Sequence, residues 1–234
     1  PAYLLPGPYA VLQSAIKLYS TGLILPHVGI TMTEMMVGYA CGCFAAFVLA
    51  ALVSEFETVE QIVVPYVIGF QSMPKVALAP LLLVWFGFGL TSKFVLVALI
   101  CFFPVFVNSL AGLRAANQDL LDLYRAFSAP RWLIFWDVKL PGAASSIFAG
   151  LQIAIVLGLI GAVVGEFVAA KQGLGHLIQA SSFNFDVGAM FTAVFTLSMI
   201  GIIGHAIVRF IQRRVVYWEG NRQTSRAAQA VEGA

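Results

Sequence analysis

Three ionisable residues, Lys75, Glu166 and His205, lie in or beside strongly apolar segments of this chain. Ionisable groups in a membrane are costly to bury, so they are candidates for a solute or proton pathway. Lys75 follows Pro74, and a helix restarting there would place unpaired N–H groups and a positive dipole end beside the ammonium, which together attract an anion. The favoured alternative is a lysine that extends to the outer headgroups. The candidate pathway residues are Gln71, Pro74, Lys75 and Glu166.

The other ionisable residues have plainer interpretations. We expect Glu166, which follows the apolar run 140–165, to be a carboxylate at the outer interface facing water, with lining of a substrate path as the alternative. His205 lies about one turn before Arg209 and is expected to be a packed or hydrogen-bonded histidine. Glu34 is expected to mark an outer helix end.

A polar stretch, residues 119–141, separates two long apolar runs and has the size of two short helices. Ser128 is a suitable N-cap, and Pro130 would occupy the first turn, where its missing N–H costs nothing. We therefore predict a short helix that begins at Ser128 and ends near Lys139, just before Pro141.

On that helix Trp132, Phe135 and Trp136 stand at i, i+3 and i+4, which gathers three aromatic rings on one face, flanked by Arg131 and Asp137. Such a face can insert into a groove of a partner protein, as amphipathic helices do. Alternatively, the helix lies in the membrane interface with its tryptophans at headgroup level. Composition alone leaves these two interpretations nearly even.

The sequence gives little support for enzymatic catalysis, metal binding or nucleic-acid binding. The chain contains no phosphate-binding Gly-x-x-x-x-Gly-Lys-Ser/Thr loop and no Gly-x-Ser-x-Gly nucleophile motif. Its three cysteines and three histidines do not have the spacing of a metal site. The net charge of +2 is not a nucleic-acid signature. We expect no metal, no cofactor and no catalysis in this chain.

The elements that must position these residues are membrane helices. The chain is 60% hydrophobic and 10% charged, far from the composition of soluble domains. A crossing needs about 20 apolar residues. The charge-free runs are 35–53, 94–113, 140–165 and 187–208, and a longer fifth run, 61–92, is interrupted by Met73-Pro74-Lys75. The sequence thus predicts an all-α polytopic membrane protein with five visible crossings, one of them kinked or discontinuous.

Basic residues fix the orientation, because Lys and Arg are retained in cytoplasmic loops. They are concentrated after residue 113 and after residue 208, which places the 119–141 stretch and the carboxyl end in the cytoplasm. Counting back five crossings puts Pro1 outside, so we expect a sixth crossing before it, with a cleaved signal as the weaker alternative. The tail, 219–234, is expected to be flexible.

Small residues recur every fourth position at Gly38, Gly42, Ala46 and Ala50, and again at Gly161 and Gly165. Such ridges let another helix approach closely in lipid. Packing within the subunit is the expected explanation, and a homodimer or heterodimer seam is the alternative.

Several motifs resemble those of ABC importer permeases of the nitrate, sulfonate and taurine type. In the polar stretch Asp122-Leu123-Tyr124 occupies the acidic-Ala-Ala triplet, Ser128 the glycine position, and Val138, Leu140 and Pro141 the Ile-x-Leu-Pro tail. The resemblance extends through Leu-Leu-Pro-Gly-Pro at residues 4–8, Gln-Ser-Met-Pro-Lys at 71–75, Trp-Phe-Gly at 85–87 and Gln-Gly-Leu-Gly at 172–175.

This resemblance implies one permease domain over residues 1–234 of a bacterial inner-membrane protein, with residues 114–140 as the ATPase-coupling loop. Separate ATPase subunits would carry ATP and Mg, a second permease copy would complete a homodimer, and a periplasmic or lipoprotein binding protein would deliver a small solute, such as a sulfonate, taurine or nitrate anion. The residues implied in coupling are Asp122, Arg125, Ser128, Ala129, Pro130, Arg131, Trp132, Phe135 and Trp136.

Two departures from the family pattern lie in this loop. Ser128 disfavours the left-handed backbone that a glycine adopts freely, and Tyr124 is bulky where a small residue is preferred. They predict a turn geometry that differs from the family's. The rival function is a proton-coupled secondary transporter or channel, in which Glu166 and His205 would relay protons.

Overall fold

The computed structural model describes residues 7–218, apart from the side chain of Ala169, so the 219–234 tail lies outside the described residues. Four helices within this range are long and apolar enough to cross a membrane. They are α2 (Leu25–Glu55), α5 (Leu90–Arg114), α8 (Leu140–Ala169) and α10 (Val187–Val215). A fifth crossing is obtained if a bent helix pair counts as one span, which confirms the predicted all-α membrane architecture.

The bent pair is the predicted discontinuous span. Helix α3 (Glu57–Gln71) ends before Pro74, and the chain restarts as a 3₁₀ turn, η1 (Lys75–Leu78), that leads into α4 (Ala79–Phe86). The two halves meet at 85°. Proline at 74 fixes φ near −65° and cannot donate a backbone hydrogen bond, so the helix ends before it.

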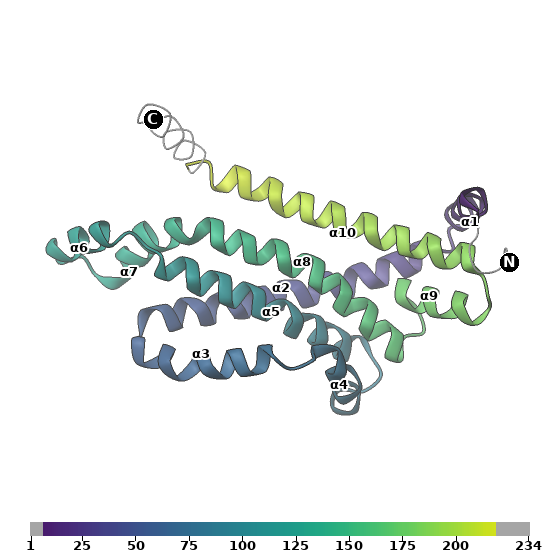
Figure 1. Ribbon diagram of the computed structural model, residues 1–234, viewed down its shortest axis with the longest axis horizontal. Coiled ribbons are helices and arrows are strands. Elements are labelled where there is room, and N and C mark those ends of the chain that lie inside the picture. The colour runs from purple at the N-terminus through teal and green to yellow at the C-terminus, as the bar shows by residue number, and fades with distance from the viewer. Residues whose placement is uncertain (1–6, 219–234) are drawn as a thin grey trace, which may run out of the picture.

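Helix α5 is the centre of the bundle and packs against α2 and α8 along its length (Figure 1). The approach of α2 depends on the small-residue ridge, because a β-carbon on Gly38 would lie 2.7 Å from the carbonyl oxygen of Phe94. On α8, a β-carbon on Gly161 would meet Ile100 of α5 at 2.9 Å. Both ridges therefore serve packing within the subunit, as expected.

The short helices gather at the two ends of the bundle. Helices α6 (Gln118–Ala126) and α7 (Arg131–Ile134) lie at one end, and α1 (Pro8–Ser20) and α9 (Leu174–Phe183) lie at the other (Figure 1). Helix α1 contacts α10, where the Tyr19 and Thr196 hydroxyls are 2.9 Å apart. Residues 114–140 thus occupy the end of the molecule opposite to α9.

All four crossing helices extend beyond the charge-free runs that the sequence defines, and two of them do so at their starts. Helix α2 begins at Leu25, and α5 begins at Leu90, so Glu34 and Lys93 lie inside helices. The prediction that Glu34 marks a helix end is therefore wrong. Both charges are tolerated there because they pair with each other, Nζ to Oε1 at 2.6 Å.

Candidate functional site

The loop of residues 114–140 has a small apolar core of its own. Asn117 caps α6, its Oδ1 accepting the backbone N–H groups of Asp119 and Leu120. The core residues of the loop are Ala116, Leu121, Ile134 and Val138, with Tyr124 and Ala129 packed against them. Residues from α6, α7 and the turn before α8 are held together in this way, so the loop is a folded unit rather than a flexible connection.

The turn after α6 is a Schellman motif. The Ala129 N–H donates to the Tyr124 carbonyl at 3.0 Å, and the Ser128 N–H donates to the Arg125 carbonyl at 2.9 Å. Ser128 has φ +54°, so it adopts the left-handed backbone that a glycine would adopt. Serine therefore adopts this backbone despite its side chain, because the two end bonds and the loop core hold the left-handed geometry against its strain.

The following helix differs from its predicted boundaries. Pro130, not Ser128, is the N-cap, and the helix does not end near Lys139. Instead α7 continues through a π-helical turn, Phe135–Lys139, into α8. Pro141 lacks an N–H, and its ring clashes with the preceding turn of an α-helix, so the widened π turn lets the chain pass this proline without a break.

The tryptophans of this helix are turned outward. Trp132 and Trp136 are 65% and 60% exposed, while Phe135 is half-buried with its ring edge-on to Trp136 at 5.8 Å. Arg131 is exposed beside them. Two large exposed rings one turn apart on a folded loop are suited to insertion into a partner.

The remaining predicted coupling residues lie on the same loop. Asp122 and Arg125 are both exposed and form an ion pair with Oδ1 and Nη1 3.0 Å apart. Ala129 and Pro130 end the Schellman turn and connect α6, which carries this ion pair, to α7, which carries Trp132. The structure thus brings all the residues implied in coupling onto one end of the bundle.

Two ion pairs attach this loop to the adjoining helix ends. Lys139 binds Glu55 at 2.6 Å and reaches the Ser54 carbonyl at 3.4 Å, which ties the π turn to the end of α2. Arg114, at the end of α5, pairs with Glu60 in the first turns of α3. The loop is therefore joined to α2, α3 and α5 as well as to α8.

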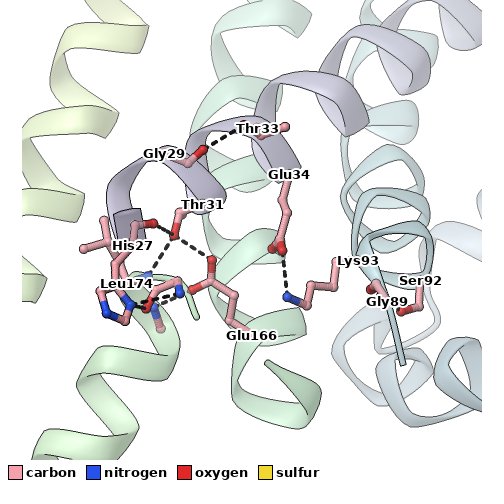
Figure 2. Close-up of polar contacts among 12 residues, drawn as sticks. His27, Gly29, Thr31, Thr33, Glu34, Gly89, Ser92, Lys93, Glu166 and Leu174 are labelled. Carbon is pink, nitrogen blue, oxygen red and sulfur yellow. Dashed lines mark hydrogen bonds and ion pairs between the residues drawn. The ribbon is translucent and has the colours of Figure 1, made fainter. Parts of the chain in front are cut away.

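At the opposite end of the bundle a buried polar cluster joins α2, α5, α8 and α9 (Figure 2). Glu166 is fully buried, and its carboxylate accepts the Thr31 hydroxyl at 2.6 Å and the Gly175 N–H. The Thr31 hydroxyl oxygen in turn accepts the Leu174 N–H at 2.8 Å. Glu166 does not face water, so its expected position at the outer interface is wrong; instead it anchors the start of α9.

Two residues that the sequence did not single out complete this cluster. Lys93 forms the buried pair with Glu34, and His27 Nδ1 lies 2.9 Å from the Gly173 carbonyl oxygen. The Gln-Gly-Leu-Gly motif reflects the Glu166 part of this cluster, since a β-carbon on Gly175 would lie 2.8 Å from Glu166 Oε2. Glycines at 173 and 175 leave the space that the carboxylate occupies.

The broken span carries the other candidate residues. Gln71 and Pro74 are exposed at the bend, and Lys75 is half-buried with Nζ 4.6 Å from the centroid of the Phe103 ring. This is a cation–π contact. The helix after Pro74 restarts as a turn of only four residues, so its dipole adds less to the ammonium than a regular helix would.

His205 is half-buried and lies on α10 in a groove between α8 and α10, near Arg209, and neither Lys75 nor Glu166 lines this groove. The structure thus separates Lys75, Glu166 and His205. The groups of a proton relay are not brought together.

Comparison with known proteins supports the resemblance. Residues 38–217 match the family described as "Binding-protein-dependent transport system inner membrane component". The chain is 33% identical to the formylaminopyrimidine transport permease protein ThiX of Halalkalibacterium halodurans, over 92% of this chain and 86% of that protein. It is 34% identical to the riboflavin transport system permease protein RibX of Chloroflexus aurantiacus, over 94% and 82%. Identity to the taurine permease TauC of Escherichia coli is 27%, over 94% and 82%.

Solved structures share the fold. A chain of an amino acid ABC transporter with histidines aligns with a TM-score of 0.69 at 15% identity, over 85% of this chain and 96% of that chain. The MetNI methionine ABC transporter in an inward-facing conformation aligns with a TM-score of 0.66 at 21% identity, over the same shares. The chain therefore belongs to the family of binding-protein-dependent transport system inner membrane components, and it is a multi-pass permease subunit of an ABC importer.

Proposed function

We propose that residues 114–140 are the surface by which separate ATPase subunits drive this permease. The supporting observation is the pair of exposed tryptophans, Trp132 and Trp136, on a loop that is otherwise packed on its own core. The sequence contains no phosphate-binding loop, so ATP and Mg²⁺ belong to those partner subunits.

In this proposal the named residues have separate roles. Trp132 and Trp136 insert into a groove of the ATPase, while Phe135 supports Trp136 from the side. The Asp122–Arg125 pair presents charge at the rim of the contact, and the Ser128 turn with Ala129 and Pro130 sets the angle between α6 and the tryptophan helix. Arg131 lies next to the inserted rings.

We infer that a second copy of the chain completes the pathway. The broken span exposes large side chains on its outward face, including Tyr66 at 68%, Phe70 at 58% and Trp85 at 68%. Lys75 and Gln71 lie at its bend. A homodimer built on this face would therefore place these two polar side chains among the aromatic rings of the broken span. A binding protein would dock at the opposite end from the coupling loop, near α1 and α9.

The substrate of this proposal is a small anion such as a sulfonate, taurine or nitrate. The ammonium of Lys75 supports it, since Nζ faces the Phe103 ring and none of the ion pairs formed within residues 7–218 includes Lys75. One relative is a taurine transport system permease protein, and taurine carries a sulfonate group.

A second candidate substrate is a planar nitrogen heterocycle. The named relatives with higher identity, 33% and 34%, are permeases for a formylaminopyrimidine and for riboflavin. The exposed aromatic rings of the broken span suit stacking on such a ring system.

The ATP-driven mechanism and the substrate class can both be tested on the assembled transporter in proteoliposomes with its binding protein. Taurine, nitrate, a formylaminopyrimidine and riboflavin are offered in turn, with ATP inside or absent. Uptake that needs ATP and a co-purifying ATPase supports the proposal, and the solute accumulated selects between the two substrate classes. Uptake that follows a proton gradient without ATP would instead favour the secondary-transporter alternative.

A further inference from the structure

An apolar groove of about 770 Å³ opens between α8 and α10. It extends from Phe167 and Val194 at the outer end to Val156 and Arg209 at the other end. Beside it the two helices touch at small residues, where a β-carbon on Gly204 would lie 3.2 Å from Ile155 Cγ1. The groove is therefore bounded on one side by this close contact.

The polar groups of the groove are concentrated at its inner end. His205 and Arg209 lie there, whereas the walls elsewhere are formed almost entirely by aliphatic and phenylalanine side chains, with Ser198 as the exception. One turn beyond Arg209, Gln152 Nε2 donates to Gln212 Oε1 at 2.5 Å and joins the two helices. Arg209 is exposed, and none of the ion pairs formed within residues 7–218 includes it.

We propose that this groove is a binding site for an anionic phospholipid of the inner leaflet. The phosphate would pair with Arg209, and one acyl chain would lie along the aliphatic walls toward Phe167. From Arg209 to Val194 the α10 axis rises roughly 22 Å, compared with about 15 Å for half of the hydrocarbon core. The groove thus has the length for one acyl chain. Basic residues at the cytoplasmic end of membrane helices attract anionic headgroups.

The observations favour a lipid over a second copy of the chain. Two copies in one membrane have the same orientation, so a two-fold seam along this groove would place both Arg209 side chains at the same depth. Like charges facing each other disfavour such a seam. The aliphatic walls likewise do not suit a sulfonate, a nitrate or a polar heterocycle, so the groove is distinct from the proposed solute path.

Two pairs of variants test the headgroup and the acyl chain separately. Arg209→Gln removes the groove cation, and Arg213→Gln removes an exposed cation one turn further that does not line the groove. Ile202→Trp fills the groove, and Ile203→Trp adds the same bulk at a similarly exposed neighbour outside it, the two isoleucines being 60% and 56% exposed.

The assembled transporter is stripped of lipid in detergent and titrated with phosphatidylglycerol or phosphatidylcholine, and bound lipid is counted by native mass spectrometry. We expect saturable binding of phosphatidylglycerol that Arg209→Gln weakens about fivefold, while Arg213→Gln leaves it near wild type. Ile202→Trp should abolish the tightly bound lipid, and Ile203→Trp should retain it.

Equal effects of the two members of either pair would overturn the proposal, because general attraction to the surface would then explain the binding. A disulfide between two chains carrying Ile202→Cys, formed in native membranes, would also overturn it and identify a second copy as the occupant. Equal affinity for phosphatidylcholine and phosphatidylglycerol would reject the headgroup assignment.

Discussion

The α-carbon of Gly173 lies against the carboxyl group of Glu166, so that a β-carbon at position 173 would overlap the carboxylate. Gly173 also has φ +125°, which L-residues rarely adopt. The buried carboxylate and the glycine loop therefore depend on each other, and together they fix where α9 begins.

Replacing Gly173 by Ala should destabilise the protein by about 3 kcal/mol or more, because strain at a positive φ adds to the overlap with Glu166. Thermal unfolding of the detergent-solubilised transporter measures the effect. Gly22→Ala is the control, since Gly22 has φ +71° but open space around it, and it should cost about 1 kcal/mol. Equal losses of stability in the two variants would show that the contact between the new β-carbon and Glu166 adds no destabilisation.

The buried pair of Glu34 and Lys93 gives a second prediction. Lys93→Met should destabilise the fold by about 3–5 kcal/mol, because it leaves an uncompensated carboxylate among buried groups. The double variant Glu34→Met, Lys93→Met should recover most of that loss, since no charge remains buried. A double-mutant cycle on the free energy of unfolding in denaturant gives the coupling free energy between the two residues. A coupling free energy near zero would contradict the ion pair.

Trp132→Ala and Trp136→Ala, combined, should release the ATPase subunits and stop transport. Each buried aromatic anchor in an interface is typically worth about 2 kcal/mol or more. Membrane folding should be unaffected, because both rings are exposed within the subunit. Phe44→Ala, at a ring that is 71% exposed on α2, is the control and should keep the ATPase bound. Pull-down of the ATPase distinguishes the outcomes; normal association in the double variant would reject docking through these rings.

Ser128→Gly should stabilise the permease by about 1 kcal/mol, because glycine adopts the left-handed angles of this turn without strain. The Schellman bonds remain, so coupling should be retained. Ala129→Gly, at the next residue and without a positive φ, should not stabilise. Melting temperatures of the two variants measured side by side provide the test, and a lower value for Ser128→Gly would exclude backbone strain at this position.

Lys75→Met should reduce uptake of an anionic solute while leaving assembly and basal ATP hydrolysis intact. The loss of the ammonium removes the attraction, and methionine keeps the contact with the Phe103 ring. Lys17→Met on the exposed face of α1 is the control. Wild-type uptake in the Lys75 variant, measured in proteoliposomes with the binding protein, would mean that this lysine serves packing alone.

The crossings were predictable because apolar runs of membrane length have few alternatives, and the break at Pro74 followed from the geometry of proline. The starts of α2 and α5 were not. A charge ends an apolar run in the sequence, but Glu34 and Lys93 are 59 positions apart and neutralise each other in space.

Local rules also failed where tertiary contacts outweigh them. Serine disfavours a left-handed turn, yet Ser128 adopts one because the ends of α6 and α7 share a core. Proline usually ends a helix, yet a π turn before Pro141 carries the helix past it. Glu166 was misplaced for a related reason, since its partners Thr31 and Gly175 lie on other elements.

The uninterrupted helix from Arg131 to Val168 has a mechanical consequence. Its 38 residues form a rod roughly 57 Å long, with the exposed tryptophans near one tip and Glu166 near the other. A rod of this kind moves as one body when it is displaced at either tip. A displacement applied at Trp132 would therefore also move Glu166, and the carboxylate would pull the first turn of α9 with it through the Gly175 N–H.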